Sequence, residues 1–212
     1  MATGEVAGTL RRQLDAANAA RETAIPACRR TIRACGSSIR AVHALDPAGA
    51  AALADEAERA LREAQEALRP FPALAATGPL HDAEKEYAEA RMTAALVAGA
   101  PLPTFEDLAV GAASWLGGLA EAGTELRRHI LDRLREGRLD EADRLLAAMD
   151  GVYGLLVSMD YPDALTGGLR RHVDSLRAVL ERTRGDFTTT VLQARLQATI
   201  EARLTADFPA VE

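Results

Sequence analysis

The longest helical pattern in this sequence runs over residues 8–45, and a run of that length restricts the class of fold that the chain can adopt. Its apolar residues return at the spacing of one helix face, with Pro26 as the expected kink. Ala, Leu and Val supply most of the hydrophobic residues, whereas aromatic residues make up only 4% of the chain. Because Ala and Leu favour helices while aromatic and β-branched residues favour strands, the sequence predicts an all-α fold.

Caps and breaks divide the rest of the chain into further helices. Asp46 followed by Pro47 is typical of a helix start, with Asp as the N-cap and Pro in the first turn. Thr104 and Asp107 have the spacing of a capping box, which predicts a short helix after them. The helix that starts at Pro47 is predicted to end at Arg69, and further helices are predicted over 80–97 and 140–159. A helix ending at Arg135 follows interruptions at Gly111, Gly117 and Gly118. Another ends at Arg184 because Gly185 is read as a stop, and the last covers 186–206. Seven or so helices with short connections predict one bundle, a single domain over residues 1–212.

The charge of the chain is acidic on average but unevenly distributed. A net charge of −6 and a pI near 5.3 argue against a general polyanion binder, since affinity for a phosphate backbone comes from clustered Lys and Arg. Two stretches, residues 10–43 and 169–184, are nonetheless rich in arginine. Stripes of arginine can hold phosphates, although ordinary ion pairs with Glu and Asp are the alternative. The candidate nucleic-acid-binding residues are Arg29, Arg33, Arg40, Arg170 and Arg171.

Targeting signals do not stand out in the sequence. The amino terminus lacks a basic-then-apolar signal pattern, and no run approaches ~18 apolar residues. We therefore expect a cytoplasmic protein with no membrane partner.

Two pairs of glutamates have the spacing of a shared helix face. Glu86 and Glu89 are i, i+3 neighbours, and Glu121 and Glu125 are i, i+4 neighbours on a later helix. Facing each other, two such pairs can bind a hard cation such as Mg²⁺ or Mn²⁺, which prefers oxygen ligands. The ordinary alternative is a solvated face on which Lys85 pairs with Glu89 at i, i+4.

Four phrases, in order along nearly the whole chain, resemble the translin family, which includes translin and translin-associated factor X. They are Lys85–Ala90 (KEYAEA), Thr124–Arg128 (TELRR), Tyr161–Leu165 (YPDAL), and Gly168–Arg171 (GLRR) continuing into Leu180–Arg184 (LERTR). Arg29 and His43 also fall where the family's first helix carries an Arg and a His. The resemblance implies a seven-helix fold, a hollow octamer and binding of single-stranded nucleic acid on a basic inner surface. In the factor X branch it further implies cleavage of single-stranded RNA with a divalent metal held by carboxylates.

The family's metal-binding pattern is a Glu-x-x-Glu pair followed later by an Asp. Glu86 and Glu89 match the pair, and the Asp position falls on Glu121 if Trp115-Leu116 aligns with the family's Tyr-Leu. Glu125 then matches the Glu of the family's Glu-Leu-Arg phrase, whereas a shifted register would place Ser114 at the Asp position. Glu is one methylene longer than Asp, so this chain departs from the pattern at a ligand.

The leading hypothesis is a homo-oligomeric, metal-dependent endoribonuclease that acts on single-stranded RNA with Mg²⁺ or Mn²⁺. Glu86, Glu89 and Glu121 would hold the metal and Glu125 would assist catalysis. The alternative is a non-catalytic protein that binds single-stranded RNA or DNA like translin, and a third reading is a structural helical assembly. HExxH, Glu-x-x-His and phosphate-loop motifs are absent, which argues against the enzyme classes that use them.

Overall fold

The computed structural model describes residues 2–75 and 78–207, and this part of the chain contains helices and no strand. The all-α prediction is therefore confirmed. The long helices are α1 (Ala2–His43), α2 (Pro47–Leu68), α4 (Pro79–Ala98), α5 (Ala112–Arg135), α6 (Leu139–Val157) and α8 (Leu169–Asp207). Two single-turn helices that the sequence did not predict, α3 (Pro72–Ala75) and α7 (Asp163–Thr166), lie in the connections. None of the described helices is long and apolar enough to cross a membrane.

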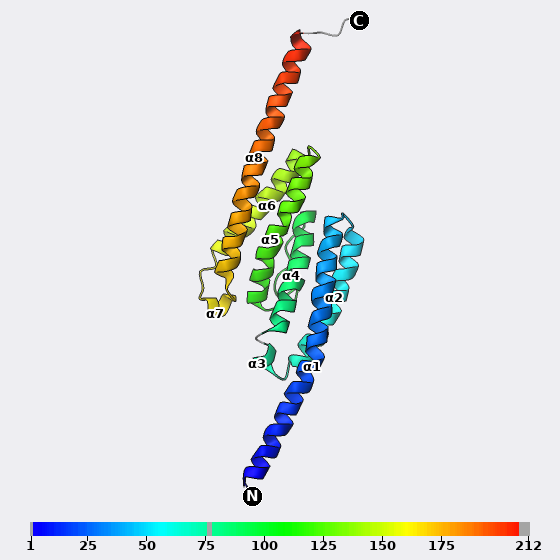
Figure 1. The fold of residues 1–212 in the computed structure, drawn as a ribbon, viewed down its shortest axis with the longest axis vertical. Coiled ribbons are helices and arrows are strands. Elements are labelled where there is room, and N and C mark those ends of the chain that lie inside the picture. The colour runs from blue at the N-terminus through cyan, green and yellow to red at the C-terminus, as the bar shows by residue number, and fades with distance from the viewer. Residues whose placement is uncertain (1, 76–77, 208–212) are drawn as a thin grey trace.

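The helices lie side by side in a flat, elongated bundle (Figure 1). α1 packs on α2 and α4, α4 packs on α5, and α5 packs on α6 and α8, so α4 and α5 form the centre. Small residues fill the contacts: Ala27, Ala57, Ala83 and Ala88 are completely buried. The amino-terminal part of α1 and the carboxyl-terminal part of α8 project beyond the bundle at opposite ends (Figure 1).

The predicted cap of α2 is present, whereas the capping box at Thr104 has a different outcome. Asp46 Oδ1 accepts a hydrogen bond of 2.9 Å from the amide of Gly49, with Pro47 in the first turn. Thr104 Oγ1 and the Asp107 carboxylate do exchange the two bonds of a capping box, at 3.1 and 2.9 Å. These bonds close a turn over residues 105–109 instead of starting a helix, because Ala109 leaves the helical region with a φ of 52°. The predicted short helix was wrong.

Glycine was misread as a helix breaker at two places. α5 runs through Gly117 and Gly118, and α8 runs through Gly185, so each of the two predicted breaks is absent. A glycine ends a helix when it takes a positive φ, and none of these three does. Gly118 instead allows α4 and α5 to touch. A Cβ at this position would lie 2.6 Å from the carbonyl oxygen of Lys85 and 2.8 Å from the amide nitrogen of Glu89.

Adding a methyl group at this contact should destabilise the fold. We expect Gly118→Ala to lower the free energy of unfolding by about 1–3 kcal/mol, because the two backbones must move apart. Gly151→Ala is the matched control: Gly151 lies in α6, with nothing within 4 Å of an added Cβ. That change should raise stability by about 0.4–1 kcal/mol. Equal urea midpoints for the two variants would contradict the close approach of α4 and α5.

Candidate metal centre and its surroundings

Three of the four candidate glutamates come together between α4 and α5. Glu86 and Glu89 project from α4 and Glu121 from α5, and one carboxylate oxygen of each lies within 4.8 Å of the others. Glu89 is only 8% exposed, which is unusual for a carboxylate. The i, i+3 spacing and the close approach at Gly118 create this cluster, which we call the acidic cluster. Its donor set of hard carboxylate oxygens has the chemistry that Mg²⁺ or Mn²⁺ requires.

The alternative register is not supported by the geometry. Ser114 Oγ lies 2.8 Å from His81 Nδ1 and 3.3 Å from a carboxylate oxygen of Glu84, away from the acidic cluster. Glu84 also accepts a hydrogen bond from the amide of Gly111, so this group holds the start of α5 against α4. Ser114 is 1% exposed, and Glu84 contacts the serine instead of orienting the histidine. The group therefore ties the start of α5 to α4 and is not a Ser–His–acid triad.

Lys85 does not make the ion pair with Glu89 that its spacing suggested. Its ammonium donates to both carboxylate oxygens of Glu121, at 2.7 Å each, and lies 3.5 Å from Glu86. Burial opposes the charge of Lys85, but the hydrogen bond and charge of Glu121, together with the charges of Glu86 and Glu89, outweigh it and raise the pKa of Lys85. The expected pairing was wrong because the aliphatic stem of Lys85 lies across Gly117 toward α5 and not along α4.

The electrostatics of the acidic cluster favour bound protons or cations. Burial, followed by the charges of Glu121, Glu86 and Glu125, raises the pKa of Glu89 to about 8. Burial also raises the pKa of Glu86, partly offset by Lys85 and reinforced by Glu121. Perturbed carboxylates of this kind are typical of functional sites.

Glu125 is tied to a pair of histidines beside the acidic cluster. Its Oε2 lies 2.7 Å from His43 Nε2, and His43 Nδ1 lies 3.0 Å from His129 Nε2, with the two rings stacked. Since a carboxylate only accepts, His43 Nε2 carries the hydrogen; a neutral His43 then accepts from the Nε2–H of His129. Burial, His43 and Arg133 lower the pKa of His129 to about 4, so His129 is neutral near pH 7. His43 of α1 thus holds Glu125 directly, and His129 of α5 in turn holds His43.

Several residues at this site were not among the predicted site residues. His172 of α8 lies 3.5 Å from Glu121, and His43, which the family resemblance marked without a role, contacts Glu125. Lys85, His43, His129 and His172 come from four different helices, so no local spacing links them. The signal that was available for His43 is its register, because it continues the stripe of Arg29, Arg33 and Arg40 at i+14.

Three arginines of α1 form an exposed stripe along the helix. Arg29, Arg33 and Arg40 are all exposed and lie on the face that His43 continues. Arg40 folds back over Gly36, with its guanidinium 2.8 Å from Ser37 Oγ. Cys35, beside Gly36, is close enough to Glu86 and Glu89 for their charges to raise its pKa, after the larger effect of burial. A basic stripe (Arg29, Arg33 and Arg40) therefore runs along the exposed face of α1, and His43, which continues its register, contacts Glu125.

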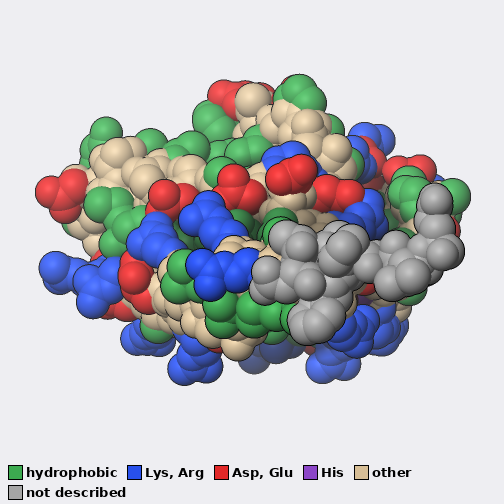
Figure 2. Space-filling model, turned by 90° about the horizontal axis from the view of Figure 1, so that it is seen from above, with side chains coloured by type: hydrophobic (Ala, Val, Ile, Leu, Met, Phe, Trp, Pro, Cys, Tyr) green, Lys and Arg blue, Asp and Glu red, His purple; other side chains and the backbone are tan. Residues whose placement is uncertain are grey.

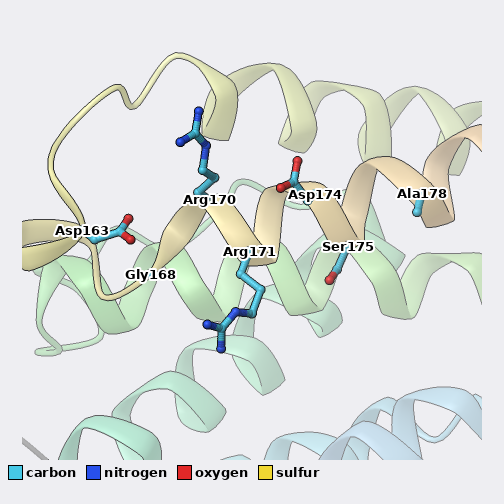
Figure 3. Close-up of a pocket in the computed structure, with 7 residues that line it drawn as sticks. All are labelled: Asp163, Gly168, Arg170, Arg171, Asp174, Ser175 and Ala178. Atoms are coloured by element: carbon cyan, nitrogen blue, oxygen red, sulfur yellow. The ribbon is translucent and has the colours of Figure 1, made fainter.

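The arginines at the start of α8 have a more mixed setting. Arg170 and Arg171 border an open groove of about 610 Å³, and the two side chains point to opposite sides of α8 (Figure 3). Arg170 shares its side with Asp174, while Arg171 shares the other with Ser175 (Figure 3). An end view of the molecule shows basic side chains gathered along its lower edge, with most acidic ones above them (Figure 2). Arg170 therefore has a carboxylate on its own side of α8, whereas the labelled neighbour of Arg171 is a serine (Figure 3).

The raised pKa of Glu89 predicts how stability depends on pH in the absence of metal. The unfolded chain releases this proton near pH 4.5, while the folded chain keeps it up to about pH 8. The contribution of Glu89 to the free energy of unfolding should therefore be complete below pH 4.5 and be lost as pH rises to about 8. In EDTA, Glu89→Gln should gain stability relative to the wild type between pH 5 and 8. Parallel urea midpoints of the two proteins across this range would contradict the shift.

The protein is an all-helical bundle with an acidic cluster between its two central helices, and solved structures of this class match it. The chain is 33% identical to C3PO of Archaeoglobus fulgidus, with a TM-score of 0.81 over 89% of this chain and 98% of that one. The same relative in a complex with duplex RNA matches with a TM-score of 0.71, over 89% and 97% of the two chains. The apo form of NeC3PO, at 17% identity and a TM-score of 0.76 over 87% and 96%, shares the fold.

Sequence comparison adds a second archaeal relative. An uncharacterised protein of Methanocaldococcus jannaschii is 29% identical over 182 residues, which cover 84% of this chain and 79% of its own. No protein-family model matches the chain. On the strength of the match to the Archaeoglobus protein, this chain belongs to the translin family.

Proposed function

We propose that this protein is a metal-dependent endoribonuclease that acts on single-stranded RNA. The observation that carries the proposal is the convergence of Glu86, Glu89 and Glu121 within 4.8 Å in a partly buried site. The complex of the related C3PO with duplex RNA supports an RNA ligand for this family member. Because that relative is seen with a duplex, both single-stranded and duplex RNA are substrates to be compared.

In this proposal Glu86, Glu89 and Glu121 would hold Mg²⁺ or Mn²⁺. A divalent cation supplies an activated water and neutralises charge that develops on a phosphate. Glu125 would accept the proton of the attacking water. His43 would hold the carboxylate of Glu125 in position for this role. The basic stripe of α1 would hold the phosphate backbone, with Arg171 and Arg170 as further contacts.

A non-catalytic RNA- or DNA-binding protein is the second candidate. It is favoured by the contact between Lys85 and Glu121, which satisfies both oxygens of one proposed ligand without a metal. The presence of Glu121 where the family has Asp also favours the non-catalytic protein. Such a protein would keep the basic stripe and use its carboxylates only for ion pairs.

Incubation of the purified protein with labelled RNA separates the two candidates. The nuclease should cut single-stranded RNA when Mg²⁺ or Mn²⁺ is present and stop when EDTA is added. RNA that is retained by the protein but remains uncut with every metal would contradict the nuclease and favour the binding protein.

We also propose that the protein is a homo-oligomer, as the octamer of the family resemblance implies. The projecting ends carry exposed apolar residues at four-residue spacing: Val6, Leu10 and Leu14 on α1, and Leu192, Leu196, Ile200 and Leu204 on α8. Apolar stripes of this length are rare on surfaces that stay in water, so a second copy of the chain is the occupant we expect.

A charge in the stripe of α8 should disrupt this assembly. We expect Leu196→Glu to reduce the molar mass in solution, because a carboxylate would be buried without a partner in the interface. Ala198→Glu is the matched control, since Ala198 is exposed on the opposite face of the same helix. Light scattering after size-exclusion chromatography measures both masses. An unchanged mass for Leu196→Glu would contradict the role of this stripe.

A further inference from the structure

Lys85 contacts two of the three carboxylates of the acidic cluster. Its ammonium nitrogen is 2.7 Å from each carboxylate oxygen of Glu121 and 3.5 Å from Glu86. The Lys85 side chain is 19% exposed, so water covers little of it. Both oxygens of Glu121 are therefore directed at Lys85, although Glu121 is the α5 member of the proposed ligand set.

The α5 helix is shaped to admit this lysine. Gly117 lies one turn before Glu121, and a Cβ at Gly117 would lie 3.3 Å from both Cγ and Cδ of Lys85. The aliphatic stem thus lies against bare helix backbone, and the ammonium reaches the next turn at Glu121. This path fixes which carboxylate of the cluster the lysine holds.

A divalent cation at this site would compete with this ammonium for Glu121. Both are positive, and the cation would need at least one of the two oxygens that Lys85 contacts, in a site where burial weakens screening by water. Lys85 also neutralises one of the carboxylates that would otherwise repel one another.

We propose that Lys85 is an internal competitor for the divalent cation: it neutralises the acidic cluster when the cation is absent and must leave Glu121 when the cation binds. This inference rests on the proposed function, specifically on the cation site of Glu86, Glu89 and Glu121. Cation binding is then an exchange, and Lys85 sets the affinity below the value that the three carboxylates alone would give.

Titration of the intact protein with Mn²⁺, followed by electron paramagnetic resonance of the free ion, tests the competition. Lys85→Met keeps an apolar stem without the charge, and Lys85→Gln is a second neutral variant. Both should bind Mn²⁺ at least about tenfold more tightly than the wild type, whereas Lys85→Arg should remain close to it. A second readout is the melting temperature in EDTA, which should fall in the neutral variants and rise more on addition of Mn²⁺ than it does in the wild type.

Glu86→Gln/Glu89→Gln serves as the variant without a site. Neutral Lys85 variants that bind Mn²⁺ as weakly as the wild type, or more weakly, would overturn the competition and leave the nuclease intact. If the wild type binds no more Mn²⁺ than the Glu86/Glu89 variant while Lys85→Met does bind it, the competition is supported and the nuclease is contradicted. Absence of binding in every variant would overturn both.

Discussion

Glu86→Gln/Glu89→Gln should lose more than about 100-fold in RNA cleavage while still binding RNA. Groups that only support metal ligands typically cost about 10–100-fold when they are replaced, so the loss of two ligands should cost more. Gln keeps the shape of each side chain but removes the charge that holds a hard cation. Stability should not suffer, because burial and the neighbouring charges raise the pKa of both carboxyls in the folded chain.

Cleavage of labelled RNA under single-turnover conditions, together with RNA binding by the same protein, measures this effect. Glu56→Gln/Glu66→Gln is the control, since it removes the same charge from two exposed positions of α2. Equal cleavage by the two double variants would contradict the assignment. A parallel loss of RNA binding would instead place these glutamates in the RNA contact and not in the chemistry.

Removal of the basic stripe should weaken RNA binding and its dependence on salt. For single-stranded nucleic acid each phosphate contact contributes roughly 0.7 to the slope of log K against log salt concentration. Arg29→Gln/Arg33→Gln/Arg40→Gln should therefore lower the slope by about 2, provided that each side chain makes one contact. The weaker binding should affect RNAs of different sequence alike, because phosphate contacts carry no sequence information.

Fluorescence anisotropy at several salt concentrations provides this slope. The control variant replaces three other exposed arginines, Arg59 and Arg62 of α2 and Arg69 at its C-cap, and so removes the same charge from another surface. We expect the slope to change in the α1 variant and to stay at the wild-type value in the control variant. Identical slopes for both variants would mean that net charge alone governs binding and that the α1 stripe has no special part in it.

The helices were largely predictable from local signals. Asp46 and Pro47 mark the start of α2 in the sequence, and the helix predicted over 80–97 corresponds to α4, which ends at Gly99 with a φ of 69°. The errors came from glycines whose role is tertiary. Gly118 permits contact with the backbone of α4, and that partner lies about thirty residues earlier in the chain. Gly185 merely continues α8, since nothing in the sequence distinguishes a glycine in a helical conformation from one that ends the helix.

The acidic cluster was predictable only in part. Glu86 and Glu89 follow from one helix face and from the family resemblance, but the position of Glu121 depended on an uncertain register. The structure brings Glu121 to them because Gly117 and Gly118 allow α5 to approach. The contacts of Lys85, His43 and His172 required the packing of separate helices and had no counterpart in sequence spacing.

Crystals of the protein grown with Mn²⁺ offer the most direct test of the central claim, that the acidic cluster is a metal centre. Anomalous diffraction at the manganese edge locates the ion without reference to activity. We expect a peak in direct contact with carboxylate oxygens of Glu86, Glu89 and Glu121, and a Lys85 ammonium that has left Glu121. Manganese bound elsewhere in the crystal, with the cluster empty and Lys85 still on Glu121, would contradict it.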